Sequence, residues 1–264
     1  MSKPTILLVP GSFALPEFYN EMFDKIRAKG YDIQGIHKPT VGLSAGQGRP
    51  GPAPSMYDDA AHIAKEVEKV ADAGKDVVLI GHSYGGVPVT EAVKGLPKKE
   101  REAQGKKGGL VNLAYMTCLV PAVGSSAADV LSKVPDDFKT PFAIGEDGWM
   151  SHVSAETTGA IIMQTVPLEV AAGWVRKMPN HSARSFADPL TYPGYRNVPV
   201  SYLFCEIDQC IPPGVQQEGI DIIEKESGNK VHVTRIHADH CPNFTAMDET
   251  VDWIVDIAER VQKQ

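Results

Sequence analysis

The sequence predicts an α/β protein in which a mostly parallel, six-stranded sheet has helices on both faces. Short apolar runs alternate with amphipathic helical stretches, and this alternation is typical of a parallel sheet because each crossover needs a helix. The alternation then stops, and helical pieces without strands follow before it resumes. We therefore expect a single domain over 1–264, with a core of 1–120 and 198–264 and a helical cap insertion at about 121–197.

Most of the predicted strands are short apolar runs, which is the pattern of strands buried on both faces of a sheet. The first run, TILLV, stops at Pro10 and Gly11, because neither residue suits the interior of a strand. We expect strands at residues 5–9, 31–36, 77–80, 110–117, 200–205 and 231–236.

The predicted helices carry recognisable start and stop signals. Ser55 and Asp58 have the spacing of a capping box, and Gly74 ends the helix that follows. The apolar residues of that helix have helical spacing: Met56, Ala60, Ile63, Val67 and Val70. Further helices are expected at residues 18–29, 86–96, 215–226 and from about 247 to 258.

The composition limits which partners and which cellular compartment we expect. A net charge of −7 argues against nucleic acid or an anionic membrane as a partner, and the Lys-rich stretch 98–107 is expected to be a solvated loop. The four cysteines form no Cys-x-x-Cys pair, and the apolar run near the amino end is too short for a membrane span. We expect a cytoplasmic protein with reduced thiols, and a homodimer is compatible with this composition.

Residues 81–86, GHSYGG, follow an apolar run directly and place Ser83 at a junction between a strand and a helix. This is the setting of a nucleophilic serine on a sharp turn, where side chains at positions 81 and 85 would collide with neighbouring chain. The helix after the turn aims its first amides at the reacting centre. The ordinary alternative is that Ser83 is a small residue in a tight turn.

A serine hydroxyl needs a base that is itself oriented by a third group. His240 lies just past the last predicted strand, and Asp208 lies in the loop after the preceding strand. His237 is the alternative base and Glu206 the alternative acid. We expect no cofactor. We also expect no metal, because no complete set of metal ligands surrounds His237 and His240.

A developing oxyanion needs two amide donors. One is expected from Tyr84, the residue after the nucleophile, and the other from Ser12 in the turn PGSF. The cap is rich in large apolar side chains, and these line either a substrate pocket or a core shared with the sheet. The residues expected to bind substrate are Phe13, Trp149, Met150, Met163 and Trp174.

The chain resembles the α/β-hydrolase superfamily, in the group of plant methyl esterases and hydroxynitrile lyases, and in particular the small fungal carboxylesterase-type hydrolases. The stretches that carry the resemblance are VPGSF, GHSYGG, GGLV, RNVPVSYLFCEIDQCIPP and ADH. The order Ser83, Asp208, His240 is the order of that superfamily. The resemblance implies an α/β-hydrolase fold, catalytic roles for these three residues, and oxyanion amides from Ser12 and Tyr84.

The resemblance also favours an esterase over a hydroxynitrile lyase. The lyases of this group carry a threonine where this chain has Gly11, and a lysine where it has Cys241. A lysine would stabilise departing cyanide, which a cysteine cannot do. The resemblance places Pro10 where a histidine is usual, and this changes a supporting contact only.

We therefore expect a serine hydrolase that cleaves a carboxylic ester, thioester or lactone of a small to medium apolar or aromatic metabolite through an acyl-enzyme. Two alternatives remain. One is a lyase, cyclase or epimerase that uses the same three residues on a specialised metabolite. The other is a ligand receptor that keeps these residues with negligible turnover.

Overall fold

The computed structural model describes residues 3–263, so residues 1–2 and 264 of the predicted core lie outside the described part. Six strands form one sheet in the order β2-β1-β3-β4-β8-β9, and every neighbouring pair is parallel. The strands are β1 (Thr5–Val9), β2 (Ile33–Gly35), β3 (Val77–His82), β4 (Leu110–Met116), β8 (Val200–Cys205) and β9 (His232–Ile236). The predicted fold class is confirmed.

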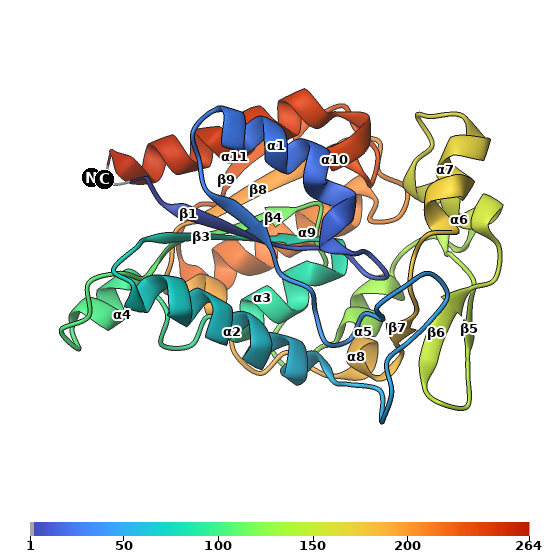
Figure 1. Cartoon of the computed structure of the whole chain (residues 1–264), viewed down its shortest axis with the longest axis horizontal. Helices are drawn as coiled ribbons and strands as arrows, with labels where there is room; N and C mark the ends of the chain where they lie inside the picture. The colour runs from blue at the N-terminus through green and yellow to red at the C-terminus, as the bar shows by residue number, and fades with distance from the viewer. Residues whose placement is uncertain (1–2, 264) are drawn as a thin grey trace.

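Helices cover both faces of this sheet (Figure 1). One face packs against α2 (Met56–Asp72), α3 (Gly86–Ala92) and α9 (Pro213–Ser227). The other face packs against α1 (Asn20–Ala28) and α11 (Met247–Gln262). The remaining short helices are η1 (Pro16–Tyr19), η2 (Ser83–Gly85), α4 (Lys98–Glu102), η4 (Gly194–Arg196) and α10 (Pro242–Thr245).

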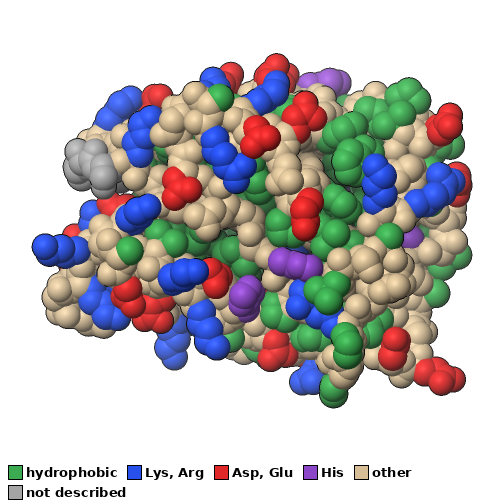
Figure 2. All heavy atoms as spheres, viewed as in Figure 1, with side chains coloured by type: hydrophobic (Ala, Val, Ile, Leu, Met, Phe, Trp, Pro, Cys, Tyr) green, Lys and Arg blue, Asp and Glu red, His purple; other side chains and the backbone are tan. Residues whose placement is uncertain are grey.

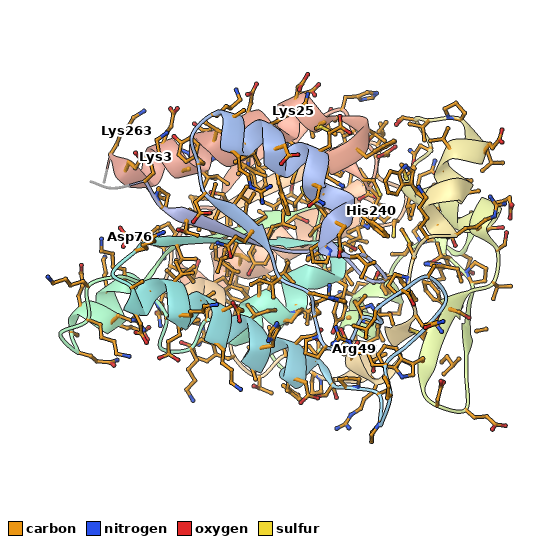
Figure 3. All side chains as sticks on the ribbon, in the orientation of Figure 1. Lys3, Lys25, Arg49, Asp76, His240 and Lys263 are labelled. Carbon is orange, nitrogen blue, oxygen red and sulfur yellow. The ribbon has the colours of Figure 1, made fainter. Side chains whose placement is uncertain are left out.

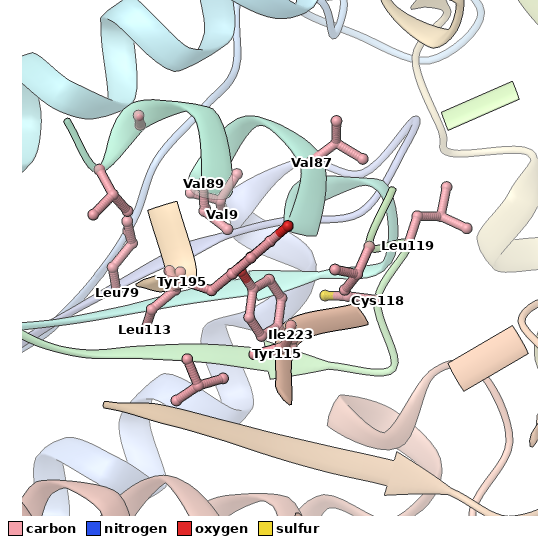
Figure 4. Close-up of a cluster of buried hydrophobic side chains, with 14 of the residues drawn as sticks. Val9, Leu79, Val87, Val89, Leu113, Tyr115, Cys118, Leu119, Tyr195 and Ile223 are labelled. Atoms are coloured by element: carbon pink, nitrogen blue, oxygen red, sulfur yellow. The ribbon is translucent and has the colours of Figure 1, made fainter. Parts of the chain in front are cut away.

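The core consists of two layers because side chains along each strand alternate between the two faces. In β3, Leu79 belongs to the cluster that includes α2, α3 and α9, and Ile80 belongs to the cluster that includes α1 and α11. Figure 4 shows part of the first cluster, with Val87 and Val89 of α3 packed over the strands. Each such side chain stabilises the fold by about 1.5–3 kcal/mol.

The cap differs from the prediction, because it contains strands. A three-stranded antiparallel sheet is formed by β5 (Phe142–Ile144), β6 (Trp149–His152) and β7 (His181–Ser182). These strands are two to four residues long, which is too short for a period of two to show in the sequence. The cap helices are α5 (Ala127–Leu131), η3 (Asp136–Phe138), α6 (Ala155–Ile162), α7 (Leu168–Val175) and α8 (Arg184–Ala187).

The Lys-rich stretch 98–107 is a solvated loop only in its second half, where residues 103–107 are exposed. It begins with α4, and Arg101 is 1% exposed. The guanidinium of Arg101 donates to the carbonyl of Gly108 at 2.7 Å and to the carboxylate of Asp72. Asp72 lies at the end of α2, so this buried cation ties α4 to α2 at the end of the sheet far from the cap (Figure 1).

The cap lies beyond the carboxyl ends of the parallel strands, at the right of Figure 1. On the face that Figure 2 shows, apolar side chains gather toward α6 and α7, and Leu168 and Val170 of α7 are exposed. Among residues 3–263, no helix combines the length and the apolar character that a bilayer crossing requires.

Candidate active site

Ser83 sits on a strained turn at the end of β3. Its φ is 54°, in the left-handed region that non-glycine residues rarely adopt. A side chain at Gly81 would place its Cβ 2.9 Å from the backbone of Gly85, and one at Gly85 would lie 2.6 Å from the carbonyl of Val9. The steric reason given by the sequence for both glycines is confirmed.

Three side chains from separate loops meet at this turn. The Nε2 atom of His240 lies 2.9 Å from Ser83 Oγ, and its Nδ1 lies 2.7 Å from Asp208 Oδ2. All three side chains are buried. Figure 3 shows His240 at the end of the sheet nearest the cap. Because a carboxylate can only accept, Nδ1 carries the hydrogen, and in the neutral imidazole Nε2 accepts from the Ser83 hydroxyl.

The Asp208 carboxylate has two further donors that fix its position. The amide of Ile211 donates to Oδ1 at 2.9 Å, and the hydroxyl of Thr117 donates to Oδ2. Thr117 directly follows β4 and has a φ of 39°, so a second strained residue supports the acid. This support holds the carboxylate in one orientation toward His240.

The alternative base and acid lie elsewhere. The side chains of His237 and Glu206 are 77% and 46% exposed, and their nearest charged atoms are 4.0 Å apart. The structure therefore brings Asp208 and His240 together with Ser83 and leaves these two residues at the surface. Within 3–263, no group of three or more His, Cys, Asp or Glu side chains is arranged to hold a metal ion.

His82 links Tyr19 to His240 through hydrogen bonds that the sequence did not predict. Its Nδ1 lies 2.6 Å from the hydroxyl of Tyr19, and its Nε2 lies 2.8 Å from the carbonyl of His240. The carbonyl of His240 can only accept, so Nε2 of His82 carries the hydrogen and Nδ1 of the neutral ring accepts from the Tyr19 hydroxyl. That hydroxyl itself accepts from the amide of Gly11 at 3.2 Å. Burial lowers the pKa of His82 to about 3, which keeps the ring neutral.

A buried aspartate ties the cap to the loop of His240. The Asp239 carboxylate accepts from the Thr165 hydroxyl at 2.6 Å and from the Cys241 amide at 3.1 Å. Thr165 lies between α6 and α7, so the cap and the loop of His240 share this carboxylate. The neighbouring Gln164 side chain donates to the carbonyl of Ile207, beside the acid.

The amide of Ser12, one of the two expected to bind an oxyanion, has no acceptor among the described residues. The next amide, that of Phe13, donates to His181 Nδ1 at 3.1 Å. Tyr84, the other expected donor, directly follows Ser83 and is buried. A Cβ at Gly11 would lie 3.2 Å from the Cβ of Ser83, so this turn packs directly on the elbow. An unsatisfied donor beside a serine hydroxyl is what an oxyanion requires.

A cavity opens over these atoms and, with its mouth, encloses about 760 Å³. Of the residues expected to bind substrate, Phe13, Met163 and Trp174 line it. Trp149 and Met150 do not. The ring of Trp149 packs on Gly48, where a Cβ would lie 2.4 Å from it, and Met150 pairs with His181 across the cap sheet.

Several lining residues were not among those expected from the sequence. They share an aromatic ring or a sulfur atom: Phe18, Phe142, His152, Met178, Cys210, Cys241 and Phe244. No Lys, Arg, Asp or Glu is among the described residues that line the cavity. His152 Nδ1 lies 3.1 Å from the Thr158 hydroxyl, and burial lowers the pKa of this histidine to about 4. The cavity is therefore apolar, with neutral polar groups at its wall.

The ionisation of His240 predicts a pH dependence. Burial lowers its pKa, but the charge of Asp208 and then Cys210 raise it, so that the net pKa lies well above 6.5. The neutral imidazole is the base, so we expect kcat/KM to increase with pH through a value above 6.5. A pH profile with a neutral ester measures this limb, and a limb centred below the ordinary histidine value would contradict the assignment.

Comparisons with known proteins agree with this fold. The model of the alpha/beta hydrolase family matches residues 6–253. The probable hydrolase R7 of Phoma sp. is 33% identical over 258 residues, which cover 98% of this chain and 99% of that protein. Methylesterase 1 of Arabidopsis thaliana is 23% identical over 201 residues, 70% of each chain. A pyrethroid hydrolase from Sphingobium faniae JZ-2 has the same fold, with a TM-score of 0.73, 18% identity and full coverage of both chains.

The chain therefore belongs to the α/β-hydrolase family. The expectation that it resembles fungal hydrolases and plant methylesterases is confirmed, and the class that these relatives support is a hydrolase.

Proposed function

We propose that this protein is a serine hydrolase that cleaves a carboxylic ester, thioester or lactone of a small to medium, neutral, apolar or aromatic metabolite. The observation that carries the proposal is the hydrogen-bonded series Ser83, His240, Asp208 at the floor of an apolar cavity. A serine, a base and an orienting carboxylate in this geometry form the constellation of acyl transfer.

The reaction has two halves. His240 Nε2 takes the hydroxyl proton as Ser83 Oγ attacks the carbonyl carbon, and Asp208 stabilises the imidazolium. The imidazolium then gives its proton to the departing alcohol or thiol, which leaves an acyl-enzyme. His240 next takes a proton from water, the hydroxide attacks the acyl carbonyl, and the acid departs as Ser83 recovers its proton. The amides of Ser12 and Tyr84 bind the oxyanion in both halves.

The cavity supports a neutral and largely apolar substrate. Its lining offers aromatic and sulfur-containing side chains, and a charged substrate would find no Lys, Arg, Asp or Glu among the described lining residues. The printed name of the Arabidopsis relative, a methylesterase, is consistent with ester cleavage.

Two observations favour hydrolysis over the reaction of the hydroxynitrile lyases. A threonine at position 11 would bring its Cβ 3.2 Å from the Cβ of Ser83, a contact that the present turn does not accommodate without a shift. Cys241 lines the cavity beside His240, and no lysine is among the described lining residues to stabilise a departing anion such as cyanide.

Turnover of short aryl esters and lactones in ¹⁸O-labelled water tests the proposal. Because water attacks the acyl-enzyme, we expect one labelled oxygen in the acid that is released, and no turnover by Ser83→Ala. Turnover without incorporation of the label would support a non-hydrolytic reaction. Absence of any turnover across the series would contradict the substrate class.

A further inference from the structure

A buried lysine lies directly behind the turn that holds Ser12. Lys38 follows β2 and is 1% exposed. Its ammonium group donates to the carbonyl of Pro10 at 2.6 Å and to the carbonyl of Gly11 at 3.0 Å. A lysine with no access to water is costly unless its hydrogen bonds are used, and both of these reach the same turn.

The carboxylate that balances the charge of Lys38 does not itself hydrogen-bond to the ammonium group. Asp59 of α2 is fully buried and accepts from the amide of Thr40 at 2.9 Å and from its hydroxyl at 2.6 Å. The hydroxyl of Tyr84 lies 3.4 Å from the same carboxylate. Asp59 therefore compensates the charge from a distance, and the direct hydrogen bonds of Lys38 remain with the turn.

The position of the ammonium determines where the Ser12 amide points. The carbonyl of Gly11 and the N–H of Ser12 belong to one peptide unit, which is trans because the described chain has no cis peptide. In a trans unit the C=O and N–H bonds point in opposite directions. A cation held on the Gly11 oxygen therefore turns the Ser12 N–H away from Lys38 and polarises the unit, so that this N–H becomes a stronger donor.

Other groups fix the rest of the turn. The amide of Gly11 donates to the Tyr19 hydroxyl, and the amide of Phe13 donates to His181 Nδ1. Among the described residues, Ser12 N has no acceptor, and Ser12 lines the cavity together with Ser83. The turn is thus held by Lys38, Tyr19 and His181, and the amide of Ser12 is left to donate to a ligand.

We propose that Lys38 is a positioning residue of the oxyanion hole, whose ammonium orients and polarises the peptide unit between Gly11 and Ser12. The inference rests on the proposed function, because it takes the Ser12 amide as a donor to the oxyanion. Nothing in this role requires Lys38 to touch the substrate. Its effect is exerted on a donor that binds the charge of the transition state.

The variant that tests this role removes both buried charges. Lys38→Met alone would leave Asp59 uncompensated in the interior and would destabilise the protein. In Lys38→Met/Asp59→Asn, methionine replaces the aliphatic stem of Lys38. Asparagine has the shape of aspartate and keeps hydrogen-bonding groups beside Thr40. We expect kcat to fall about 10- to 100-fold with little change in KM, less than the loss of a whole oxyanion donor. The affinity for a trifluoromethyl ketone, which forms a tetrahedral adduct, should fall by a similar factor.

The matched control is Arg101→Met/Asp72→Asn. Arg101 is also a buried cation that holds a backbone carbonyl, but it lies in α4, far from the cavity. We expect this pair to lower Tm without changing kcat or inhibitor affinity of the folded protein. Asp59→Asn alone keeps both hydrogen bonds of Lys38 and should retain most of the activity.

The outcomes separate this inference from the proposed function. A folded double variant with unchanged kcat and inhibitor affinity would overturn the role of Lys38, whereas wild type that neither turns over esters nor binds the ketone would overturn the proposed function. If the methionine variant does not fold, Lys38→Gln/Asp59→Asn retains one donor without charge. An intermediate loss of kcat is then expected, and wild-type kcat in that variant would again contradict the proposal.

Discussion

Replacement of Ser83 by alanine is expected to lower kcat by a factor on the order of 10⁶ while the fold and the cavity stay intact. The hydroxyl is the only group lost, and it is the group that lies 2.9 Å from His240 Nε2. Alanine meets the same positive φ of 54° as serine, so the strain of the turn does not change with the substitution. Steady-state and single-turnover hydrolysis of an aryl ester measure the effect.

The matched control is Ser132→Ala. The Ser132 hydroxyl is exposed, follows α5 and donates only to the local carbonyl of Asp129. Its replacement should leave kcat unchanged. A Ser83→Ala protein that keeps more than about one hundredth of wild-type kcat, after contaminating esterase is excluded, would show that another group performs the attack.

Asp208→Asn is expected to lower kcat by about 10⁴-fold with little effect on stability of the sheet. An asparagine presents an amide hydrogen to Nδ1 in one orientation, and this favours the wrong tautomer of His240. In addition, the charge that raises the pKa of His240 is removed, whereas the burial that lowers this pKa remains. Any residual activity should therefore show an acid limb at lower pH than the wild type.

Glu206→Gln provides the comparison for this substitution. The Glu206 side chain is 46% exposed and faces His237 rather than His240. We expect wild-type activity and an unchanged pH profile. If kcat were to fall in Glu206→Gln and not in Asp208→Asn, the acid would be Glu206 and the hydrogen bonds around Asp208 would have only a structural role.

The elbow could be predicted from sequence because its constraints are local. Gly81 and Gly85 are required by contacts within a few residues of Ser83, so the pattern Gly-x-Ser-x-Gly records the geometry directly. Asp208 and His240 could be proposed because each follows a predicted strand, and parallel strands end at one edge of the sheet. Alternation of strands and helices was sufficient for the fold class.

The supporting contacts could not be predicted, because they join segments that are far apart in the chain. Lys38 reaches back to Pro10 and Gly11, and His82 contacts His240, with separations of 27 to 158 residues. Nothing in the local sequence of Lys38 distinguishes it from a surface lysine. Such contacts depend on how the loops fold over the strand ends, which composition and periodicity do not specify.

The orientation of the side chains in the cap could not be predicted from the sequence either. Trp149 was expected in the pocket because it is large and apolar, but size and hydropathy do not determine which face of a short strand meets the cavity. The structure turns its ring onto Gly48 and brings Phe18, Phe142 and Phe244 to the cavity instead. The division of the domain into core and cap at about 121 and 198 remains a prediction.

The central claim is that Ser83, activated by His240 and Asp208, becomes covalently modified during turnover. Peptide mass mapping after reaction with a fluorophosphonate tests it most directly, because this probe reports the nucleophile itself. We expect one adduct, on the peptide that contains Ser83, with labelling abolished in Ser83→Ala and strongly slowed in Asp208→Asn. An adduct on another residue, or an unmodified Ser83 in protein that hydrolyses esters, would contradict the account.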